Sequence, residues 1–248
     1  MTNKNKPTIL IFLTSLLFWI IFILPLPLYF LLSILTIVIG QKVRYRVIIT
    51  LCYFYCWFIK YVCGLKYNIV NPENIPTDPC VIVSNHQSMW ETCVFNRILK
   101  DIVFILKREI LMIPLFGWGI NGIAPIAIDR TKGDLAMQKL TQQGRQRITA
   151  GFSLLIFPEG TRLKIGQKKQ FKYGAVKIAT LLDTTITPIA INSGVYWPKK
   201  SFFIYPGIVT VVVGKAIEPP KTEDDCVEAT QAIQDWIYTT LDNITDQE

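Results

Sequence analysis

A single histidine is the first residue to consider for chemistry in this chain of 248 residues, because His86 supplies its only imidazole. Imidazole is the side chain whose ordinary pKa lies nearest neutrality, so acid–base chemistry near pH 7 has to use His86 or another kind of group. The apolar run 80–84, which precedes His86, is typical of a short buried strand. The residues that follow His86, up to Leu99, are typical of a helix. The sequence therefore predicts His86 on a strand-to-helix turn, where reactive side chains are often exposed.

Glu91 is a carboxylate that could orient this imidazole. Five residues advance an ideal helix by about 500°, which would leave His86 and Glu91 roughly 140° apart if both were helical. The two meet only if His86 precedes the helix, and Glu91 could then accept the proton of one ring nitrogen while the other takes a proton from a hydroxyl. Ser88-Met89-Trp90-Glu91 also fits a capping box, with Ser88 as N-cap and Glu91 at the third helical position. Spacing alone leaves both roles of Glu91 open.

Cationic residues follow three more of the predicted strands. Lys107 follows Phe104-Ile105-Leu106, Asp129-Arg130 follows the strand 123–128, and Pro158-Glu159-Gly160-Thr161-Arg162 follows the strand 152–157. Because the carboxyl ends of strands in an open α/β sheet meet in one crevice, we expect these groups near His86. A phosphate suits them, since Arg offers a bidentate fork, Lys a point charge, and Gly160 lets backbone amides approach an oxyanion. Any one Arg alone would be read as a surface ion pair, but their convergence on the lone histidine favours a binding site.

The composition predicts a membrane-associated protein. Apolar residues make up 51% of the chain and the mean hydropathy is +0.35, both high for a soluble protein. Residues 1–72 carry seven Lys and Arg and no acid, residues 73–217 carry eighteen against nine acids, and residues 218–248 carry one against nine. The two basic regions suit an anionic membrane surface and an anionic substrate. Nucleic acid is the other partner that a pI of 9.2 suits, but no nucleic-acid-binding motif is recognisable, so we expect none.

Residues 1–65 are predicted to form a membrane hairpin followed by an interfacial helix. Residues 8–24 are an apolar run, Pro25 and Pro27 interrupt it, and residues 28–40 are apolar again. Lys and Arg flank both ends, so both are expected on the cytoplasmic side. Runs of 17 and 13 residues are short for spanning helices, which leaves two thin crossings and a dip into one leaflet that returns at the prolines as alternatives. The aromatic-rich segment 47–62 is expected at the interface, with a third span as the alternative.

Residues 66–248 are predicted to form one catalytic domain. Strands are expected at 80–84, 102–106, 123–128, 152–157, 186–191 and 208–213, and helices at 134–150, 172–182 and 222–240. This alternation predicts an α/β fold with a mixed, largely parallel sheet and surrounding helices. The six cysteines lack zinc-ligand spacing and one histidine does not complete a Cys2His2 site, so buried free thiols are expected and no metal.

The chain resembles the bacterial 1-acyl-glycerol-3-phosphate acyltransferases of the glycerolipid acyltransferase superfamily. Four blocks carry the resemblance in order: Asn85 to Glu91, Gly122 through Ile128-Asp129-Arg130, Phe157 to Arg162, and Ile186 to Ala190. Phe171-Lys172, Gly174-Ala175 and Leu106 to Glu109 are similar to further family features, and the resemblance covers about residues 66–217. One departure is Glu91, where the family usually has Asp, so the carboxylate is kept on a longer arm.

The resemblance implies transfer of a fatty acyl group from an acyl thioester to the sn-2 hydroxyl of 1-acyl-glycerol 3-phosphate (lysophosphatidic acid), which gives phosphatidic acid. It implies the following roles: His86 as general base, Glu91 as its orienter, Arg130 and Arg162 as phosphate ligands with Lys107 as a weaker candidate, and Glu159, Gly160 and Thr161 as residues that shape the phosphate pocket. It implies no cofactor, with acyl-CoA or acyl-ACP (acyl carrier protein) as co-substrate. The implied location is the bacterial inner membrane, with the site on the cytoplasmic face.

Other acceptors and other classes of protein remain to be weighed against this expectation. Glycerol 3-phosphate and other lysophospholipids are alternative acceptors, because the four blocks are shared among such enzymes. A non-catalytic membrane interaction protein with the same fold would not need both His86 and its carboxylate. A thioesterase would have to bind a water molecule but not a phosphate group. The two motif blocks that contain Arg130 and Arg162 argue against this class.

Overall fold

A seven-stranded sheet forms the centre of the computed structural model, which describes residues 6–35, 41–114, 116–120, 123, 125–129 and 133–246. The strands are β1 Leu65–Val70, β2 Val81–Ser84, β3 Ile102–Lys107, β4 Ile126–Ile128, β5 Ser153–Ile156, β6 Ile186–Ile191 and β7 Gly207–Val213. The α-helices are α1 Ile9–Ile23, α2 Leu26–Leu35, α3 Gln41–Tyr61, α4 Trp90–Ile98, α5 Phe116–Ile120, α6 Gly133–Thr149, α7 Gly174–Leu182 and α8 Glu223–Asp246. Short 3-10 helices cover Pro72–Asn74, Arg108–Met112 and Ser193–Val195.

The sheet order brings the predicted chemical residues to one edge. The strands lie in the order β1-β7-β6-β2-β5-β3-β4, and every neighbouring pair is parallel except β6 with β7. The carboxyl ends of β6, β2, β5, β3 and β4 therefore lie along the same edge. This arrangement confirms the expected mixed, largely parallel α/β sheet. The sequence analysis missed β1 and started β4 three residues too early, at position 123 instead of 126.

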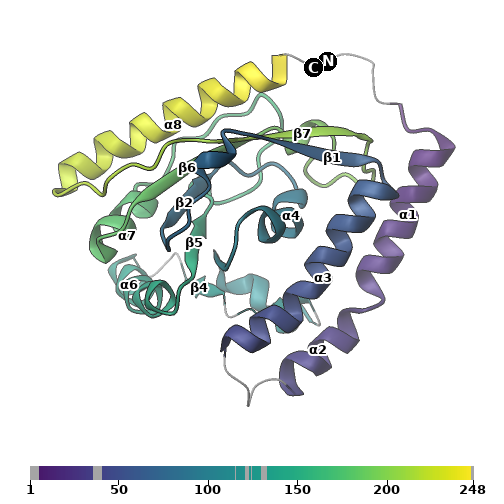
Figure 1. Cartoon of the computed structure of the whole chain (residues 1–248), viewed down its shortest axis with the longest axis horizontal. Helices are drawn as coiled ribbons and strands as arrows, with labels where there is room; N and C mark the ends of the chain where they lie inside the picture. The colour runs from purple at the N-terminus through teal and green to yellow at the C-terminus, as the bar shows by residue number, and fades with distance from the viewer. Residues whose placement is uncertain are drawn as a thin grey trace.

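Helices cover both faces of the sheet and exclude water from its centre. Helices α6, α7 and α8 pack against one another and on the sheet, whereas α4 and α3 lie on the other side (Figure 1). All four residues of β2 are buried, which is the pattern of a strand covered on both faces. His86 follows directly after this rigid central strand.

The N-terminal helices form a hairpin, with α1 and α2 as one arm and α3 as the other. Helices α1 and α2 run in the same general direction, and α3 returns beside them (Figure 1). The hydroxyl of Tyr55 in α3 donates to the carbonyl of Phe22 in α1 at 3.0 Å, which fixes the two arms together. The expected return of the chain at Pro25 and Pro27 is wrong. Proline is tolerated in the first turn of a helix, where its missing N–H is not needed, so these residues accompany a break between α1 and α2 and not a reversal.

The first helix is also bound to the loop between β6 and β7. The indole Nε1 of Trp19 donates to the carbonyl of Phe202 at 2.9 Å, and Ser15 Oγ accepts the N–H of Ile204 at 3.0 Å. The ring of Phe18 meets that of Trp197 edge-on, with centroids 5.1 Å apart. The hairpin is therefore attached to the sheet domain by specific contacts.

Large apolar side chains are exposed along the N-terminal hairpin. The segment Ile9–Leu32 has 24 residues and a mean hydropathy of 2.8, and its length and composition suffice to cross a membrane. Trp57 and Tyr61 of α3 are exposed as well, and such aromatic residues favour the membrane–water interface. An apolar surface of this extent is unfavourable in water and indicates membrane association. The exposed apolar residues of α1 and α2 include Ile9, Leu10, Phe12, Leu13, Leu17, Ile20, Ile23, Leu28, Leu31 and Ile34.

Asn85 extends the pairing of β2 with β6 by one side chain. Its Nδ2 donates to the carbonyl of Ile191 at 2.8 Å, and its Oδ1 accepts the N–H of Ile191 at 2.9 Å. Asn85 is fully buried, so water does not replace these bonds. The two bonds fix the direction in which the chain leaves β2 toward His86.

We expect Asn85→Ala to lower the free energy of unfolding by roughly 2–4 kcal/mol, because it leaves a buried N–H and a buried C=O unpaired. Circular dichroism during denaturation in detergent measures this change. Asn68→Ala is the matched control, since Asn68 is exposed on β1, and it should change stability by less than about 0.5 kcal/mol. Equal losses in the two variants would contradict the stabilising role of Asn85.

Candidate active site

His86 lies between a buried carboxylate and a guanidinium. Its Nδ1 is 3.3 Å from Glu91 Oε2, and its Nε2 accepts a hydrogen bond from Arg162 Nε at 3.4 Å. The ring stacks on Phe157 with centroids 3.9 Å apart and 12° between the planes. The His86 side chain is 13% exposed, so part of the ring is reachable from outside. The structure therefore brings together three of the predicted groups at the edge formed by β2 and β5.

Glu91 lies beside the imidazole and also binds backbone N–H groups at the start of α4, although α4 begins at Trp90 with Met89 as its N-cap and not with the expected Ser88. His86 precedes α4, and this is the geometry in which the imidazole and the carboxylate meet. The same carboxylate accepts the backbone N–H groups of Gln87 and Ser88 at 3.0–3.1 Å, as the reaching-back half of a capping box does. Ser88 Oγ accepts the N–H of Trp90 at 3.1 Å and thereby covers the helix start. The contact with His86 Nδ1 is a close approach that lacks hydrogen-bond alignment.

Ser193 is a residue of this site that the sequence analysis missed. Its hydroxyl donates a short hydrogen bond to Glu91 Oε1. It lies in the 3-10 helix after β6, and the next residue, Gly194, donates its N–H to Gln87 Oε1 at 3.2 Å. The rule that pointed to the ends of β5 and β4 also applies to β6, so that strand end was the available signal. With this hydroxyl and the two backbone N–H groups, the fully buried carboxylate has the donors it needs to remain hydrogen-bonded away from water.

The loop after β5 encloses His86 from several directions. Phe157 covers the ring face, Arg162 reaches Nε2, and Leu163 donates its N–H to the carbonyl of His86 at 2.8 Å. Gly160 adopts a positive φ of 73°, where glycine is favoured, and its N–H closes a turn on the carbonyl of Phe157 at 3.0 Å. Thr161 is exposed at the tip of this turn. The loop thus sets the position of His86 as well as that of Arg162.

Glu159 points into the protein. Its Oε2 accepts the backbone N–H of His86 at 2.8 Å, its Oε1 lies 3.2 Å from the hydroxyl of Tyr238, and only 1% of the residue is exposed. Burial raises the pKa of this carboxyl to about 8, while the two hydrogen bonds oppose the rise. Its carboxyl group therefore supports the His86 backbone, although the sequence analysis expected it to shape the phosphate pocket.

Of the other predicted phosphate ligands, the structure describes Lys107 but not Arg130. Lys107 ends β3, and its Nζ forms an exposed ion pair with Glu109 Oε1 at 3.0 Å. Arg130, and Gly122 of the same block, lie outside the described residues. Lys107 is paired in register with Ile128 at the end of β4, so both strands finish at the same edge as β5.

Metal-ligating side chains do not gather anywhere in the described ranges. No group of three His, Cys, Asp or Glu residues there has metal-binding proximity. The six cysteines, Cys52, Cys56, Cys63, Cys80, Cys93 and Cys226, are free thiols.

Comparison with known proteins identifies the family. A sequence model described as Acyltransferase matches residues 66–192, slightly more than half of the chain. The chain belongs to this acyltransferase family. The matched segment contains His86, Glu91, Glu159 and Arg162, and it ends immediately before Ser193.

Relatives of this acyltransferase agree with the assignment over most of its length. The 1-acyl-sn-glycerol-3-phosphate acyltransferase of Pseudomonas aeruginosa is 38% identical over 213 residues, which cover 84% of this chain and 82% of the relative. The human 1-acyl-sn-glycerol-3-phosphate acyltransferase beta is 34% identical over 168 residues, which cover 65% of this chain and 60% of the relative. The crystal structure of the 1-acyl-sn-glycerophosphate acyltransferase PlsC from Thermotoga maritima aligns with a TM-score of 0.72 over 94% of this chain and 96% of that one, at 19% identity. The shared fold therefore extends beyond the matched segment.

The raised pKa of Glu159 predicts how stability changes with pH. In the folded acyltransferase this carboxyl keeps its proton up to about pH 8, whereas in the unfolded chain it ionises near its ordinary value of 4.5. The folded state binds the extra proton between these values, so this contribution to stability is full below pH 4.5 and is lost as the pH rises to about 8. We expect Glu159→Gln to gain stability relative to the parent protein as the pH rises through this window.

Denaturation midpoints of the two proteins at several pH values measure this difference. Glu73→Gln is the control, because Glu73 is exposed, and its midpoint should follow the parent protein at every pH. A Glu159→Gln curve parallel to that of the parent would show that Glu159 does not carry the extra proton.

Proposed function

We propose that this acyltransferase transfers a fatty acyl group from an acyl thioester to the sn-2 hydroxyl of 1-acyl-glycerol 3-phosphate and so forms phosphatidic acid for phospholipid biosynthesis. The observation that carries this proposal is the 3.4 Å contact between the imidazole Nε2 of His86 and the guanidinium of Arg162. A base and a phosphate ligand side by side suit a substrate whose reacting hydroxyl is two carbon atoms and one oxygen away from its phosphorus. The names of the relatives support the same substrate.

His86 acts as the general base in this proposal. A phosphate that takes up the N–H of Arg162 leaves the Nε2 lone pair free for the substrate hydroxyl. As the hydroxyl oxygen attacks the thioester carbonyl carbon, its proton passes to Nε2, the new C–O bond forms and the C–S bond breaks. The proton then goes to the departing thiolate, so His86 returns to its neutral state. No acyl-enzyme forms, and the free cysteines take no part.

Glu91 orients the imidazole and stabilises its charged form. Its carboxylate is held by Ser193 and by the backbone of Gln87 and Ser88, so it does not reorganise when His86 takes up a proton. The longer arm of Glu, compared with the usual Asp, is accommodated because Oε2 reaches Nδ1 from the first turn of α4. A fixed negative charge at this distance favours proton transfer to the opposite ring nitrogen.

Arg162 and Arg130 hold the phosphate in this proposal, with Lys107 as a further positive charge at the same edge. Glu159, Gly160 and Thr161 give the loop its conformation, since Gly160 closes the turn and Glu159 fixes it to His86. Catalysis then depends mainly on positioning, because a gripped phosphate leaves the glycerol hydroxyl beside the base.

The N-terminal hairpin keeps the site at the membrane surface, where the acceptor and the product reside. Residues 1–65 supply this anchor and residues 66–248 the catalytic domain. An interfacial site avoids drawing acyl chains into water. We place the enzyme at the cytoplasmic face of a bacterial inner membrane, because basic residues flank the hairpin. The reaction itself uses no cofactor beyond the thioester.

The test is acyl transfer by purified protein in detergent, with palmitoyl thioester and either lysophosphatidic acid or glycerol 3-phosphate. Phosphatidic acid is expected from the first acceptor, and His86→Ala should lower kcat by about 10²–10⁴-fold. Product from glycerol 3-phosphate alone would overturn the assigned acceptor. Unchanged turnover in His86→Ala would overturn the assigned base.

Arg162→Ala is expected to raise KM for lysophosphatidic acid by roughly 10- to 100-fold, because a charge-assisted bond to phosphate is lost. Initial rates over a range of acceptor concentrations measure this change. Arg145→Ala is the matched control, since Arg145 lies on α6 and bonds only the carbonyl of Leu181 among its described contacts. An unchanged KM in Arg162→Ala would remove Arg162 from the phosphate site.

A further inference from the structure

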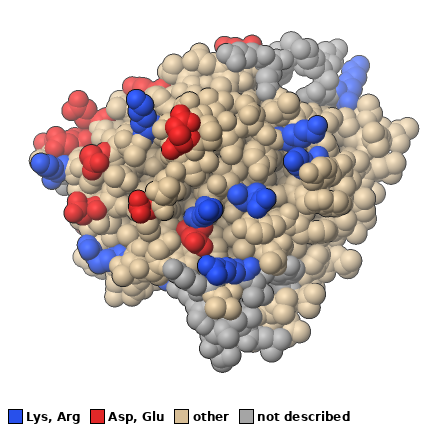
Figure 2. Space-filling model, viewed as in Figure 1, with Lys and Arg blue, Asp and Glu red and all other residues tan. Residues whose placement is uncertain are grey.

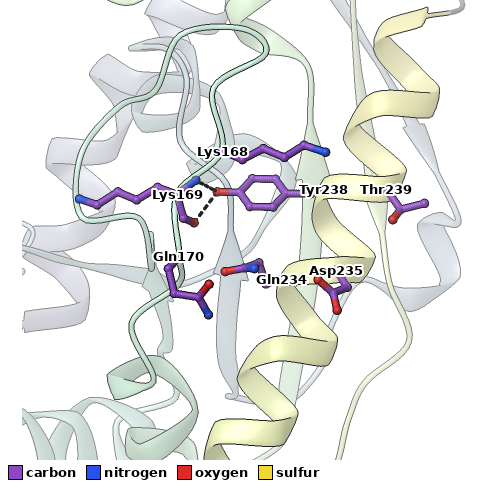
Figure 3. Close-up of a pocket in the computed structure, with 7 residues that line it drawn as sticks. All are labelled: Lys168, Lys169, Gln170, Gln234, Asp235, Tyr238 and Thr239. Atoms are coloured by element: carbon purple, nitrogen blue, oxygen red, sulfur yellow. Dashed lines mark hydrogen bonds between the residues drawn. The ribbon is translucent and has the colours of Figure 1, made fainter.

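The C-terminal helix contributes one buried hydroxyl to the back of the active site. Tyr238 of α8 projects toward the segment 168–170, and its hydroxyl lies against the backbone of Lys169 (Figure 3). The hydroxyl accepts the N–H of Lys169 at 3.0 Å and lies 2.8 Å from the carbonyl of the same residue. It also lies 3.2 Å from Oε1 of Glu159.

A proton count decides how these groups are connected. The Tyr238 hydroxyl has one proton but faces two acceptors, the carbonyl of Lys169 and Oε1 of Glu159. If Glu159 is ionised, only one of these two acceptors receives the proton. If Glu159 is neutral, its own O–H donates to the Tyr238 oxygen, and Tyr238 donates to Lys169. The N–H and C=O of Lys169, the hydroxyl of Tyr238 and Oε1 of Glu159 then all have hydrogen-bond partners. An unpaired polar group would be costly in this buried place.

The other end of Glu159 is attached to the proposed base. Its Oε2 accepts the backbone N–H of His86 at 2.8 Å, which is a bond that a neutral carboxyl can also accept through its carbonyl oxygen. His86 is thus connected to α8 through one carboxyl group and one phenol. This connection ends at the backbone N–H of His86.

We propose that Tyr238 is a positioning residue, which together with neutral Glu159 forms a hydrogen-bonded bridge from α8 to the backbone of His86. The proposal rests on the function proposed above, because it gives the bridge a role in aiming the base. The hydrogen bonds described for the Tyr238 hydroxyl go to Lys169 and Glu159, and Tyr238 lies outside the segment 66–192 that matches the family. A residue acting in this way affects turnover more than binding of the acceptor.

The charges around Glu159 are consistent with a neutral carboxyl at neutral pH. Four groups act on it: the backbone N–H of His86, the hydroxyl of Tyr238, the negative charge of Glu91 and the positive charge of Lys169. Burial is the largest influence and raises the pKa, Glu91 raises it as well, and the two hydrogen bonds and Lys169 lower it, which together give a pKa of about 8. Ionisation at higher pH draws the Tyr238 proton away from the carbonyl of Lys169 and changes the bond to His86.

The single histidine of the chain permits a direct measurement of this bridge. Protein labelled with ¹⁵N only in histidine gives one backbone amide signal, and that amide is the donor to Glu159. In detergent, between about pH 6 and about pH 9.5, we expect this signal to move near pH 8 as Glu159 ionises, in addition to any movement caused by the imidazole itself.

Two variants and one control separate the bridge from general effects on folding. Glu159→Gln keeps a carbonyl for His86 and an N–H for Tyr238, so the signal should stay near its low-pH position and the step near pH 8 should disappear. Tyr238→Phe should shift the step and lower kcat roughly tenfold at neutral pH with KM for lysophosphatidic acid unchanged. Tyr45→Phe removes another buried hydroxyl, bonded to Asn96 and Ile102, and should leave both the step and kcat unchanged.

The results separate this inference from the proposed function, because the amide signal does not depend on turnover. A parent protein without the step, or a step that Glu159→Gln leaves in place, overturns the bridge even if lysophosphatidic acid is a substrate. A step that Tyr238→Phe does not move, or a change in KM without a change in kcat, also overturns the role of Tyr238. A step that behaves as expected in a protein that does not acylate lysophosphatidic acid supports the bridge and overturns the assigned substrate alone.

Discussion

The buried carboxylate of Glu91 is the interaction on which the active site depends. A fully buried negative charge is tolerated only where donors surround it, and here the donors come from the turn after β2 and from the 3-10 helix after β6. Meeting this requirement brings the ends of two neighbouring strands together and starts α4 at the same point. The position of His86 is one consequence, since its ring lies against the same carboxylate.

A second buried carboxyl, that of Glu159, lies in a different environment, in which burial raises its pKa to about 8. Glu91 accepts hydrogen bonds from two backbone N–H groups and one hydroxyl, whereas Glu159 has fewer donors and a pKa raised by burial to about 8. The two carboxyl groups flank one histidine, one at the imidazole and one at the backbone. Figure 2 shows how differently the surface is arranged, with acidic side chains gathered around α8 and basic side chains spread toward the middle of this face. The uneven distribution of charged residues along the sequence accounts for this surface. The environments of the two buried carboxyl groups depend instead on individual contacts within the fold.

The fold was largely predictable because its strongest signals are local. The run 186–191 is mostly apolar and is a strand with the expected limits, whereas the other expected strands begin or end one to three residues from their expected limits. The convergence of His86, Glu91 and Arg162 followed from the rule that carboxyl ends of parallel strands share an edge. Ser193 and Tyr238 were not found, because their importance depends on partners about 80 to 100 positions away. Strand β1 was not predicted although its burial alternates as in a half-buried strand; it is short and pairs with the distant β7.

The contacts of α1 have a consequence for how this protein can be handled. Phe18 packs on Trp197, and Trp197 donates its backbone N–H to the carbonyl of Ser193, the residue that holds Glu91. Trp197, Ser193 and Glu91 therefore connect α1, with its exposed apolar surface, to the imidazole of His86. Removing the N-terminal helices to obtain a water-soluble enzyme would expose the ring of Trp197 and loosen the support of Glu91 and His86. Detergents and nanodiscs that preserve the hairpin are accordingly part of the conditions for activity, and solubility is better sought by replacing the outward-facing leucines than by truncation.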